Sequence, residues 1–214
     1  MKYLLKQDLA GFYKFINDNC IHKWCIFDDS IKNRYEYGQN GKQFLAIKNL
    51  ADTKKINYNQ AEIISWLDSM IVLAKSLNKL EPYDDTLEYN LMIIAELHMP
   101  LTNKRADYVL FKDNKILIIE FSYAKSEDEA QRYNFKLNQV MQYKEILQSL
   151  LPKTIEIGTY TCILAPNTED ENHSIASKNL FLFMKNFFIT QNLNALEEFK
   201  NMESKLLNEN FEEE

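Results

Sequence analysis

The spacing of apolar residues along the chain predicts where helices and strands form. In residues 5–17 apolar side chains recur every three or four positions, which predicts an amphipathic helix. A longer helix is predicted over residues 61–80, because Asn59 is a suitable N-cap and Pro82 follows its end. The polar stretch that follows the first helix, from residue 18 to about residue 49, has no clear assignment.

The middle of the chain changes to short apolar runs that are typical of β-strands. Strands are predicted over residues 91–97, 106–111, 116–121 and 159–165. Only residues 112–115 separate the second run from the third, with Asp113 and Asn114 as the turn, so these two strands must form an antiparallel hairpin. The third run is apolar on both faces, which predicts a central place in the sheet.

Helices complete the predicted order of elements. A long helix is predicted over residues 127–150, and two more over residues 179–188 and 193–208. Strands interleaved with helices indicate a mixed α/β fold in which helices flank a small sheet. We expect a single domain over residues 1–214, composed of a core over 58–166, an N-terminal extension over 1–57 and C-terminal helices over 167–214.

Composition and charge narrow the class of protein. The hydrophobic content of 46% is enough for a packed core and argues against disorder. The net charge of −6 does not suit general electrostatic binding to nucleic acid, although a carboxylate cluster that binds Mg²⁺ is itself acidic. Cys20, Cys25 and Cys162 lack metal-site spacing, and we interpret them as reduced thiols of a cytoplasmic protein. No apolar run is long enough to cross a bilayer, so no membrane association is expected.

Acidic residues stand in or beside three of the predicted strands. Asp107 lies on the second strand, Glu120 ends the third, and Glu96 lies on the first. A buried carboxylate is unfavourable unless it is paired or bound to a cation. Three carboxylates from neighbouring strands would suit a hard divalent cation such as Mg²⁺ or Mn²⁺. Taken singly, each is better explained as an exposed strand-end charge or, for Asp107, by pairing with Lys104 or Arg105.

The helix after these strands carries a polar stripe. Arg132, Lys136, Gln139 and Tyr143 follow one another at intervals of three or four residues and therefore share a face. Val140, Leu147 and Phe135 are expected to point elsewhere, toward a core. By itself the stripe is explained as a solvated helix face. Beside a carboxylate cluster it would contact phosphates or supply a cation.

Residues 61–165 resemble the PD-(D/E)XK nuclease superfamily, and most closely the nuclease-like domain that precedes Schlafen-type helicase domains in bacterial proteins. The segments that carry this resemblance are EIISW, AELHMPL, NKRADYVLF, IIEFS and QVMQYKEIL. The resemblance implies a restriction-endonuclease-like fold. It also implies a metal site for Mg²⁺ or Mn²⁺ in which Asp107 and Glu120 are ligands, with Glu96 and Glu62 as auxiliary acidic ligands. Gln139 and Tyr143 would match a Gln-x-x-x-Tyr motif that borders the site and contacts DNA, and Arg132 extends it.

The family motif has a lysine two residues after the glutamate, and in this chain that position is Ser122. A hydroxyl cannot stabilise developing charge as a cation does. Two explanations remain open. Either the catalytic lysine has moved to the helix, with Lys136 favoured over Lys125, or the site is degenerate and the domain binds without cutting.

The leading functional hypothesis is a metal-dependent nuclease, or a nuclease-derived domain, that acts on DNA in defence or repair. The alternative is a catalytically inactive module of the same fold that binds nucleic acid or a partner protein such as a helicase. A homo-oligomer is a further possibility, because aromatic residues are dense near the C-terminus, although a core helix explains them as well. These aromatic residues are Phe181, Phe183, Phe187 and Phe188.

Overall fold

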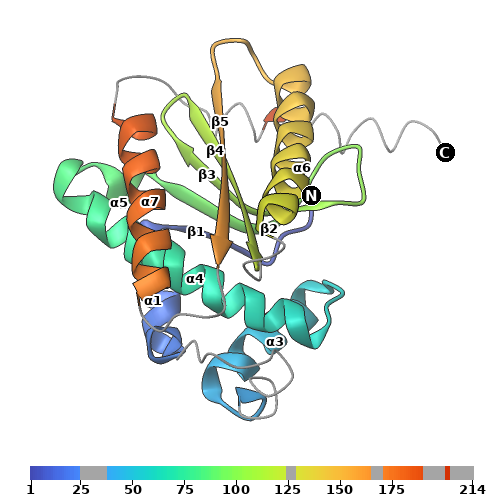
Figure 1. The fold of residues 1–214 in the computed structure, drawn as a ribbon, viewed down its shortest axis with the longest axis vertical. Coiled ribbons are helices and arrows are strands. Elements are labelled where there is room, and N and C mark those ends of the chain that lie inside the picture. The colour runs from blue at the N-terminus through green and yellow to red at the C-terminus, as the bar shows by residue number, and fades with distance from the viewer. Residues whose placement is uncertain (25–37, 124–128, 165–170, 190–200, 203–214) are drawn as a thin grey trace.

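A five-stranded mixed sheet with helices on both faces forms the centre of the protein (Figure 1). The computed structural model describes residues 1–24, 38–123, 129–164, 171–189 and 201–202. The strands lie side by side in chain order, the first four antiparallel and the last parallel to its neighbour. They are β1 (Leu5–Asp8), β2 (Met92–His98), β3 (Arg105–Lys112), β4 (Lys115–Tyr123) and β5 (Glu156–Leu164). The predicted mixed α/β sheet is confirmed, and the predicted central strand, β4, is an interior one.

Two buried clusters lie on opposite faces of this sheet. One face is covered by α6 (Glu129–Leu150), and the other by three helices that share a single apolar cluster with the strands. These three are α1 (Leu9–Asp18), α4 (Gln60–Leu80) and α7 (Glu171–Phe188). Figure 1 shows α6 and α7 on either side of β5. No helix in the described part of the chain is long and apolar enough to cross a membrane.

Short elements connect the main ones. The helix α3 (Lys42–Lys54) packs beside α4, and it begins inside the stretch for which the sequence pattern gave no assignment. Two single turns, η1 (Ile21–Lys23) and η2 (Glu81–Tyr83), and the short helix α5 (Leu87–Asn90) complete the described elements. The predicted helix over residues 193–208 lies almost wholly outside the described residues.

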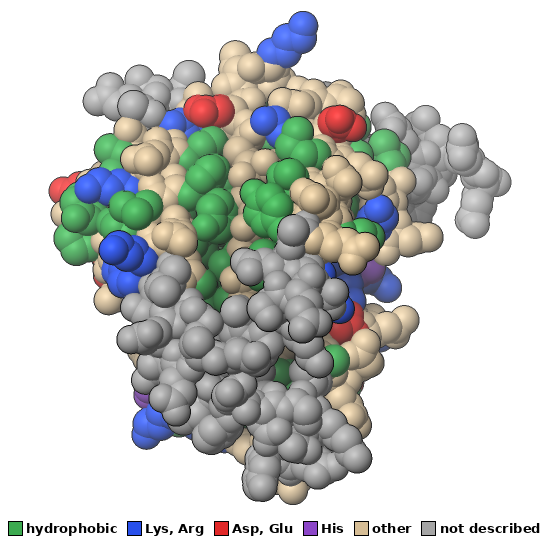
Figure 2. All heavy atoms as spheres, viewed as in Figure 1, with side chains coloured by type: hydrophobic (Ala, Val, Ile, Leu, Met, Phe, Trp, Pro, Cys, Tyr) green, Lys and Arg blue, Asp and Glu red, His purple; other side chains and the backbone are tan. Residues whose placement is uncertain are grey.

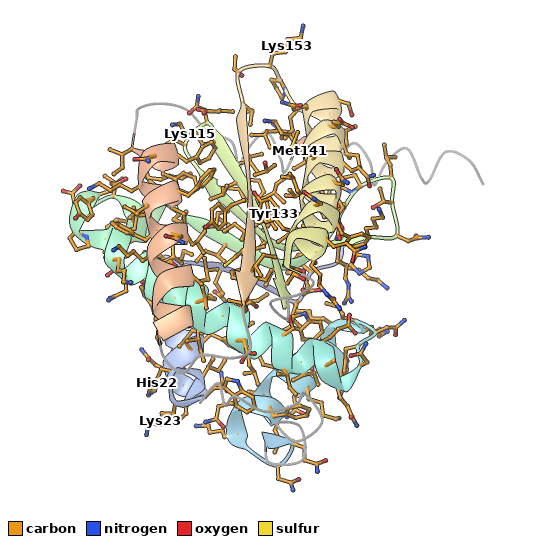
Figure 3. The ribbon with its side chains drawn as sticks, viewed as in Figure 1. His22, Lys23, Lys115, Tyr133, Met141 and Lys153 are labelled. Carbon is orange, nitrogen blue, oxygen red and sulfur yellow. The ribbon has the colours of Figure 1, made fainter. Side chains whose placement is uncertain are left out.

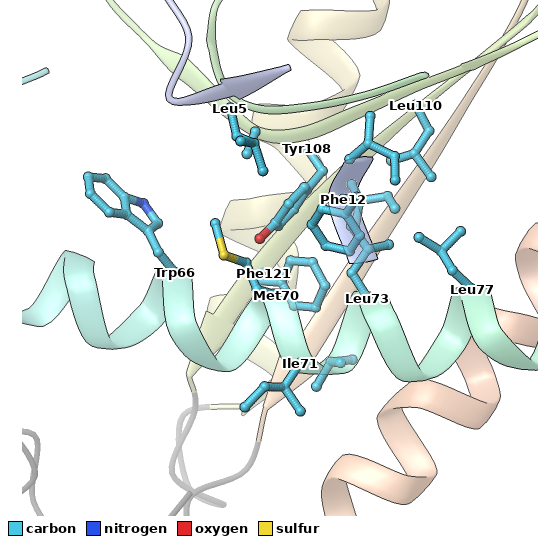
Figure 4. Packing of buried hydrophobic residues seen from close by; sticks show 14 of the residues in the cluster. Leu5, Phe12, Trp66, Met70, Ile71, Leu73, Leu77, Tyr108, Leu110 and Phe121 are labelled. Carbon is cyan, nitrogen blue, oxygen red and sulfur yellow. The ribbon is translucent and has the colours of Figure 1, made fainter. Parts of the chain in front are cut away.

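The helix α4 packs its apolar face toward the sheet. Its apolar side chains, among them Trp66, Met70 and Leu73, rise toward Tyr108 on β3 (Figure 4). The Tyr108 hydroxyl lies 3.1 Å from the Ser69 hydroxyl, so the one polar atom of this buried ring is paired. This contact joins α4 directly to β3.

The start of α4 is set by the N-cap predicted from the sequence. The Asn59 side chain accepts a hydrogen bond from the Glu62 backbone N–H at 3.0 Å, and the Glu62 carboxylate accepts one from the Asn59 N–H at 2.7 Å. This reciprocal pair is a capping box, which satisfies two of the free N–H groups at a helix start. The cap also fixes Glu62, whose carboxylate pairs with Arg105 at the start of β3.

The predicted helix over residues 5–17 is wrong in its first turn. Leu5–Asp8 form the edge strand β1, which pairs antiparallel with residues 92–95 of β2, and the helix begins only at Leu9. The Asp8 side chain accepts a hydrogen bond from the Gly11 N–H at 2.7 Å and so ends the strand and caps the helix. Leu5 and Leu9 are both buried, and their spacing fits a helix as well as this strand-to-helix junction.

Hydrophobic side chains also reach the surface along the β5 edge. On the face shown in Figure 2 they form a band where Figure 1 has β5, between α7 and α6. Tyr133 and Met141 on α6 lie beside this band and are exposed (Figure 3). The aromatic residues of α7 considered for an oligomer contact pack against the core; three of them are partly buried and Phe188 is fully buried.

Gly158 on β5 is a sensitive position for this packing. A Cβ added there would lie 2.6 Å from Cε2 of Phe187, closer than real contacts allow. We expect Gly158→Ala to lower the free energy of unfolding by about 1–3 kcal/mol through overpacking, as measured by urea denaturation. The same change in a Phe187→Leu background should cost less, because the ring that it meets is smaller. Equal costs in both backgrounds would contradict this contact.

Candidate active site

Three carboxylates lie in one row across the sheet. Extending the observed strand registers by one position sets Glu96 opposite Asp107, and Asp107 opposite Glu120. Residues directly opposite each other on neighbouring strands are a few ångströms apart. The sheet thus brings together the acidic residues that the sequence placed on three separate strands.

The regular alternation of side chains is interrupted at this row. Leu97 and Ala106 pack on the α6 side, although alternation from Ala95 and Tyr108 would turn them toward α4. Glu96 accommodates the change with a φ of 53°, a left-handed conformation that is uncommon for residues other than glycine. Such conformations cost free energy and concentrate at functional sites.

Asp107 and Glu120 also replace part of the strand ladder. The regular backbone pairing of β3 with β4 ends at Tyr108 and Ile119, one residue before Asp107 and Glu120. There the Asp107 N–H donates to Glu120 Oε1 at 3.0 Å, and the Phe121 N–H donates to Asp107 Oδ2 at 2.7 Å. Each carboxylate is therefore held by a backbone N–H near the other, which fixes both side chains.

Lys136 reaches into this pair from α6. Its Nζ lies 2.6 Å from Glu120 Oε2 and 3.6 Å from Asp107 Oδ2. The Glu120 side chain is fully buried, whereas Asp107 and Lys136 keep 23% and 19% of their side-chain surface exposed. The open side of the site is therefore the side of Asp107 and Lys136.

Burial and crowding of like charge shift the pKa values of these groups. Burial, with the nearby Asp107 carboxylate, raises the pKa of Glu120 to about 8, against the opposing effect of Lys136. Burial also raises the pKa of Asp107, and it raises that of Glu96 well above its usual range. Burial alone would lower the pKa of Lys136, but the surrounding carboxylates outweigh it and raise it. The row carries more negative charge than Lys136 alone balances.

Arg105 organises the outer acidic residues. Its guanidinium pairs with Glu62, and its Nε lies 3.4 Å from Glu96 Oε2. It also donates to the Asn57 carbonyl and lies 5.8 Å from the Trp66 ring centroid. The two predicted auxiliary ligands, Glu62 and Glu96, are thus joined to each other through Arg105. The pairing of Arg105 with Asp107 considered from the sequence is not the arrangement seen.

The pair of Asp107 and Glu120 is chemically suited to a divalent cation. In the described part of the chain, no three His, Cys, Asp or Glu side chains are grouped closely enough to hold a metal ion. However, Asp107 and Glu120 already share one cation, the ammonium of Lys136. Mg²⁺ is commonly held by one or two carboxylates, with water and substrate phosphate as its other ligands. The residues present fit such an ion.

The Gln-x-x-x-Tyr pair of α6 connects the helix to the sheet. Gln139 Nε2 donates to the Tyr143 hydroxyl at 2.6 Å, and that hydroxyl donates to the Arg105 carbonyl at 2.9 Å. Tyr143 is fully buried in the same cluster as Val140 and Leu147, so the predicted separation of the stripe from these residues is wrong.

The remaining residues of α6 divide differently from the sequence expectation. Phe135, expected in the core, has 69% of its surface exposed, because the helix face that meets the sheet is set by Lys136 and Tyr143. Arg132 is exposed one turn before Lys136. The stripe is thus a sheet-facing surface from Lys136 onward and a solvent-facing one at Arg132.

No protein-family model matches the chain, and comparisons with curated proteins and with solved structures likewise find no match. What the site can do therefore follows from its own residues.

We expect Lys136→Met to lower the free energy of unfolding at neutral pH by about 2–3 kcal/mol, because it leaves Glu120 buried without its cation. Protonation of Glu120 limits the loss. Adding Glu120→Gln should recover most of it, because a neutral amide no longer needs the ammonium. Urea denaturation of the wild type, both single variants and the double variant measures this coupling. A double variant whose loss equals the sum of the two single losses would show that the residues are not coupled.

Proposed function

We propose that this protein is a metal-dependent phosphodiesterase that cleaves nucleic acid, with DNA as the favoured substrate. The observation that carries the proposal is the position of Lys136, whose ammonium lies between Asp107 and Glu120. It supplies from α6 the cation that Ser122 does not provide on β4.

The order of elements supports a restriction-endonuclease-like fold. The helix α4 precedes three antiparallel strands, α6 follows them, and β5 then returns parallel to β4. In this order the two acidic strands β3 and β4 are neighbours, and α6 covers the face on which Glu120 meets Lys136. The arrangement agrees with what the sequence resemblance implies.

Asp107 and Glu120 would hold the metal ion, Mg²⁺ or Mn²⁺. When bound, such an ion supplies positive charge to a phosphate group and lowers the pKa of a bound water. The two carboxylates are held in place for this by the backbone N–H groups of Phe121 and Asp107. Lys136 would hold the attacking water and offset the negative charge that develops on the phosphate.

The neighbouring residues would bind the substrate and support the ligands. Arg132 is exposed on the same helix as Lys136 and would contact the nucleic-acid backbone. Gln139 borders the site and would do the same, while Tyr143 keeps α6 in position. Glu62 and Glu96, joined by Arg105, would act on the metal ion through water.

The test is cleavage of labelled single-stranded DNA, duplex DNA and RNA with Mg²⁺ or Mn²⁺ and with a chelator. We expect Asp107→Asn, Glu120→Gln and Lys136→Met each to reduce the rate by at least about 100-fold, because each removes a charge from the site. Lys144→Met, on the same helix but outside the site, is the matched control and should cleave like the wild type. Cleavage that persists in all three site variants would refute this assignment.

A non-catalytic binding module is the second candidate. One observation that favours it is the ion pair in which Lys136 already neutralises a site carboxylate. Another is the net charge of −6, which suits a protein partner better than a nucleic acid. A helicase encoded separately, or a second copy of this chain, would be such a partner. In this case calorimetry should detect no divalent-ion binding, and Lys136→Met should leave the complex with the partner intact.

A further inference from the structure

Thr161 on β5 extends the acidic row to a fourth strand. The parallel register of β4 with β5 sets Thr161 beside Glu120. Thr159, two residues earlier on the same strand, contacts Met141 of α6 through its hydroxyl, 3.9 Å from the sulfur. Because side chains alternate along a strand, Thr161 also faces α6, the side from which Lys136 enters. Cys162 packs in the cluster on the opposite face, as this alternation requires.

The hydroxyl of Thr161 is a polar group without an explanation in the fold. The residue is 8% exposed, and its Oγ1 is buried with no hydrogen-bond partner among the described residues. Most buried hydroxyls in folded proteins are hydrogen-bonded to protein or to an ordered water. Buried waters typically bond polar groups that have no other partner, so the unpaired hydroxyl beside Glu120 points to such a ligand.

We infer that Thr161 is a positioning residue that holds an ordered water beside Glu120 and Lys136. The site is too buried at this point for a nucleotide to reach the hydroxyl, whereas a water molecule needs only a few polar partners. Glu120 lies beside Thr161 in the sheet register and is paired with the Lys136 ammonium, so both would supply such partners. This inference rests on the proposed function for its catalytic part, in which the water keeps Lys136 and Glu120 in the arrangement that the reaction requires.

The first experiment is a comparison of crystal structures that does not depend on activity. Wild-type crystals at high resolution should show a water that is hydrogen-bonded to Thr161 Oγ1 and to Glu120 or Lys136. Thr161→Val, which keeps the shape but not the hydroxyl, should lack this water. A Thr161 hydroxyl bonded only to protein, or a water that persists in the valine variant, would overturn the inference.

The second experiment separates a positioning role from a structural one. Thr161→Val should keep or raise the denaturation midpoint, because it removes an unsatisfied buried hydroxyl. It should nevertheless reduce kcat at least about 10-fold with KM changed less than twofold, because the bound substrate is then processed by a displaced Lys136. Thr161→Ser should restore kcat to within about threefold of the wild type.

Thr159→Val is the matched control, because this threonine lies on the same strand and face but not beside Glu120. It should leave kcat unchanged. Equal kcat for wild type and Thr161→Val, or equal losses in both threonine variants, would overturn the positioning role. A wild-type protein that cleaves no nucleic acid would overturn the proposed function and the catalytic part of this inference, while the crystal comparison alone decides the water site.

Discussion

The ion pair between Lys136 and Glu120 is the contact on which the rest of the site depends. Burial favours the protonated form of this carboxylate, and a cation within contact distance opposes that by favouring the charged form. Lys136 provides that cation and at the same time joins α6 to β4. The other oxygen of Glu120 accepts the Asp107 N–H, so the same side chain also closes the gap where β3 and β4 part.

The charged side chains of the site form two groups, here called the inner and the outer layer, each with two carboxylates and one basic side chain. In the inner layer Lys136 faces Asp107 and Glu120, and in the outer layer Arg105 faces Glu62 and Glu96. Each layer therefore has more carboxylates than basic side chains. Burial raises the pKa values of Glu96 and Glu120, and the like charge of the neighbouring Asp107 raises them further. The divalent cation proposed at the inner pair would offset this excess of negative charge.

Much of this arrangement could be predicted from the sequence because local patterns encode it. The helix α4 has a strong apolar stripe and its own capping box, and the hairpin of β3 and β4 follows from a two-residue turn. The place of Lys136 followed from its spacing to Gln139 and Tyr143, since residues three and seven positions apart share a helix face.

The remaining features depend on partners that are distant in the chain. The strand β1 is defined by pairing with β2, some ninety positions away. Arg105 is placed by Glu62, 43 residues before it, so no local pattern indicates that pair. The change of face at Glu96 needs a left-handed conformation at a residue that rarely adopts one, so no local pattern predicts it.

A lysine carried by a helix makes the site depend on the seating of that helix. A lysine on β4 would be held by the strand itself, whereas Lys136 keeps its place only if α6 stays in register with the sheet. The tie that provides this lies two turns further along, where the buried Tyr143 hydroxyl donates to the Arg105 carbonyl on β3. Arg105 in turn holds Glu96, which faces Asp107 across the row. The Gln-x-x-x-Tyr pair therefore has a structural task that accounts for its burial: it couples the position of the one cation in the inner layer to the strand that carries Asp107.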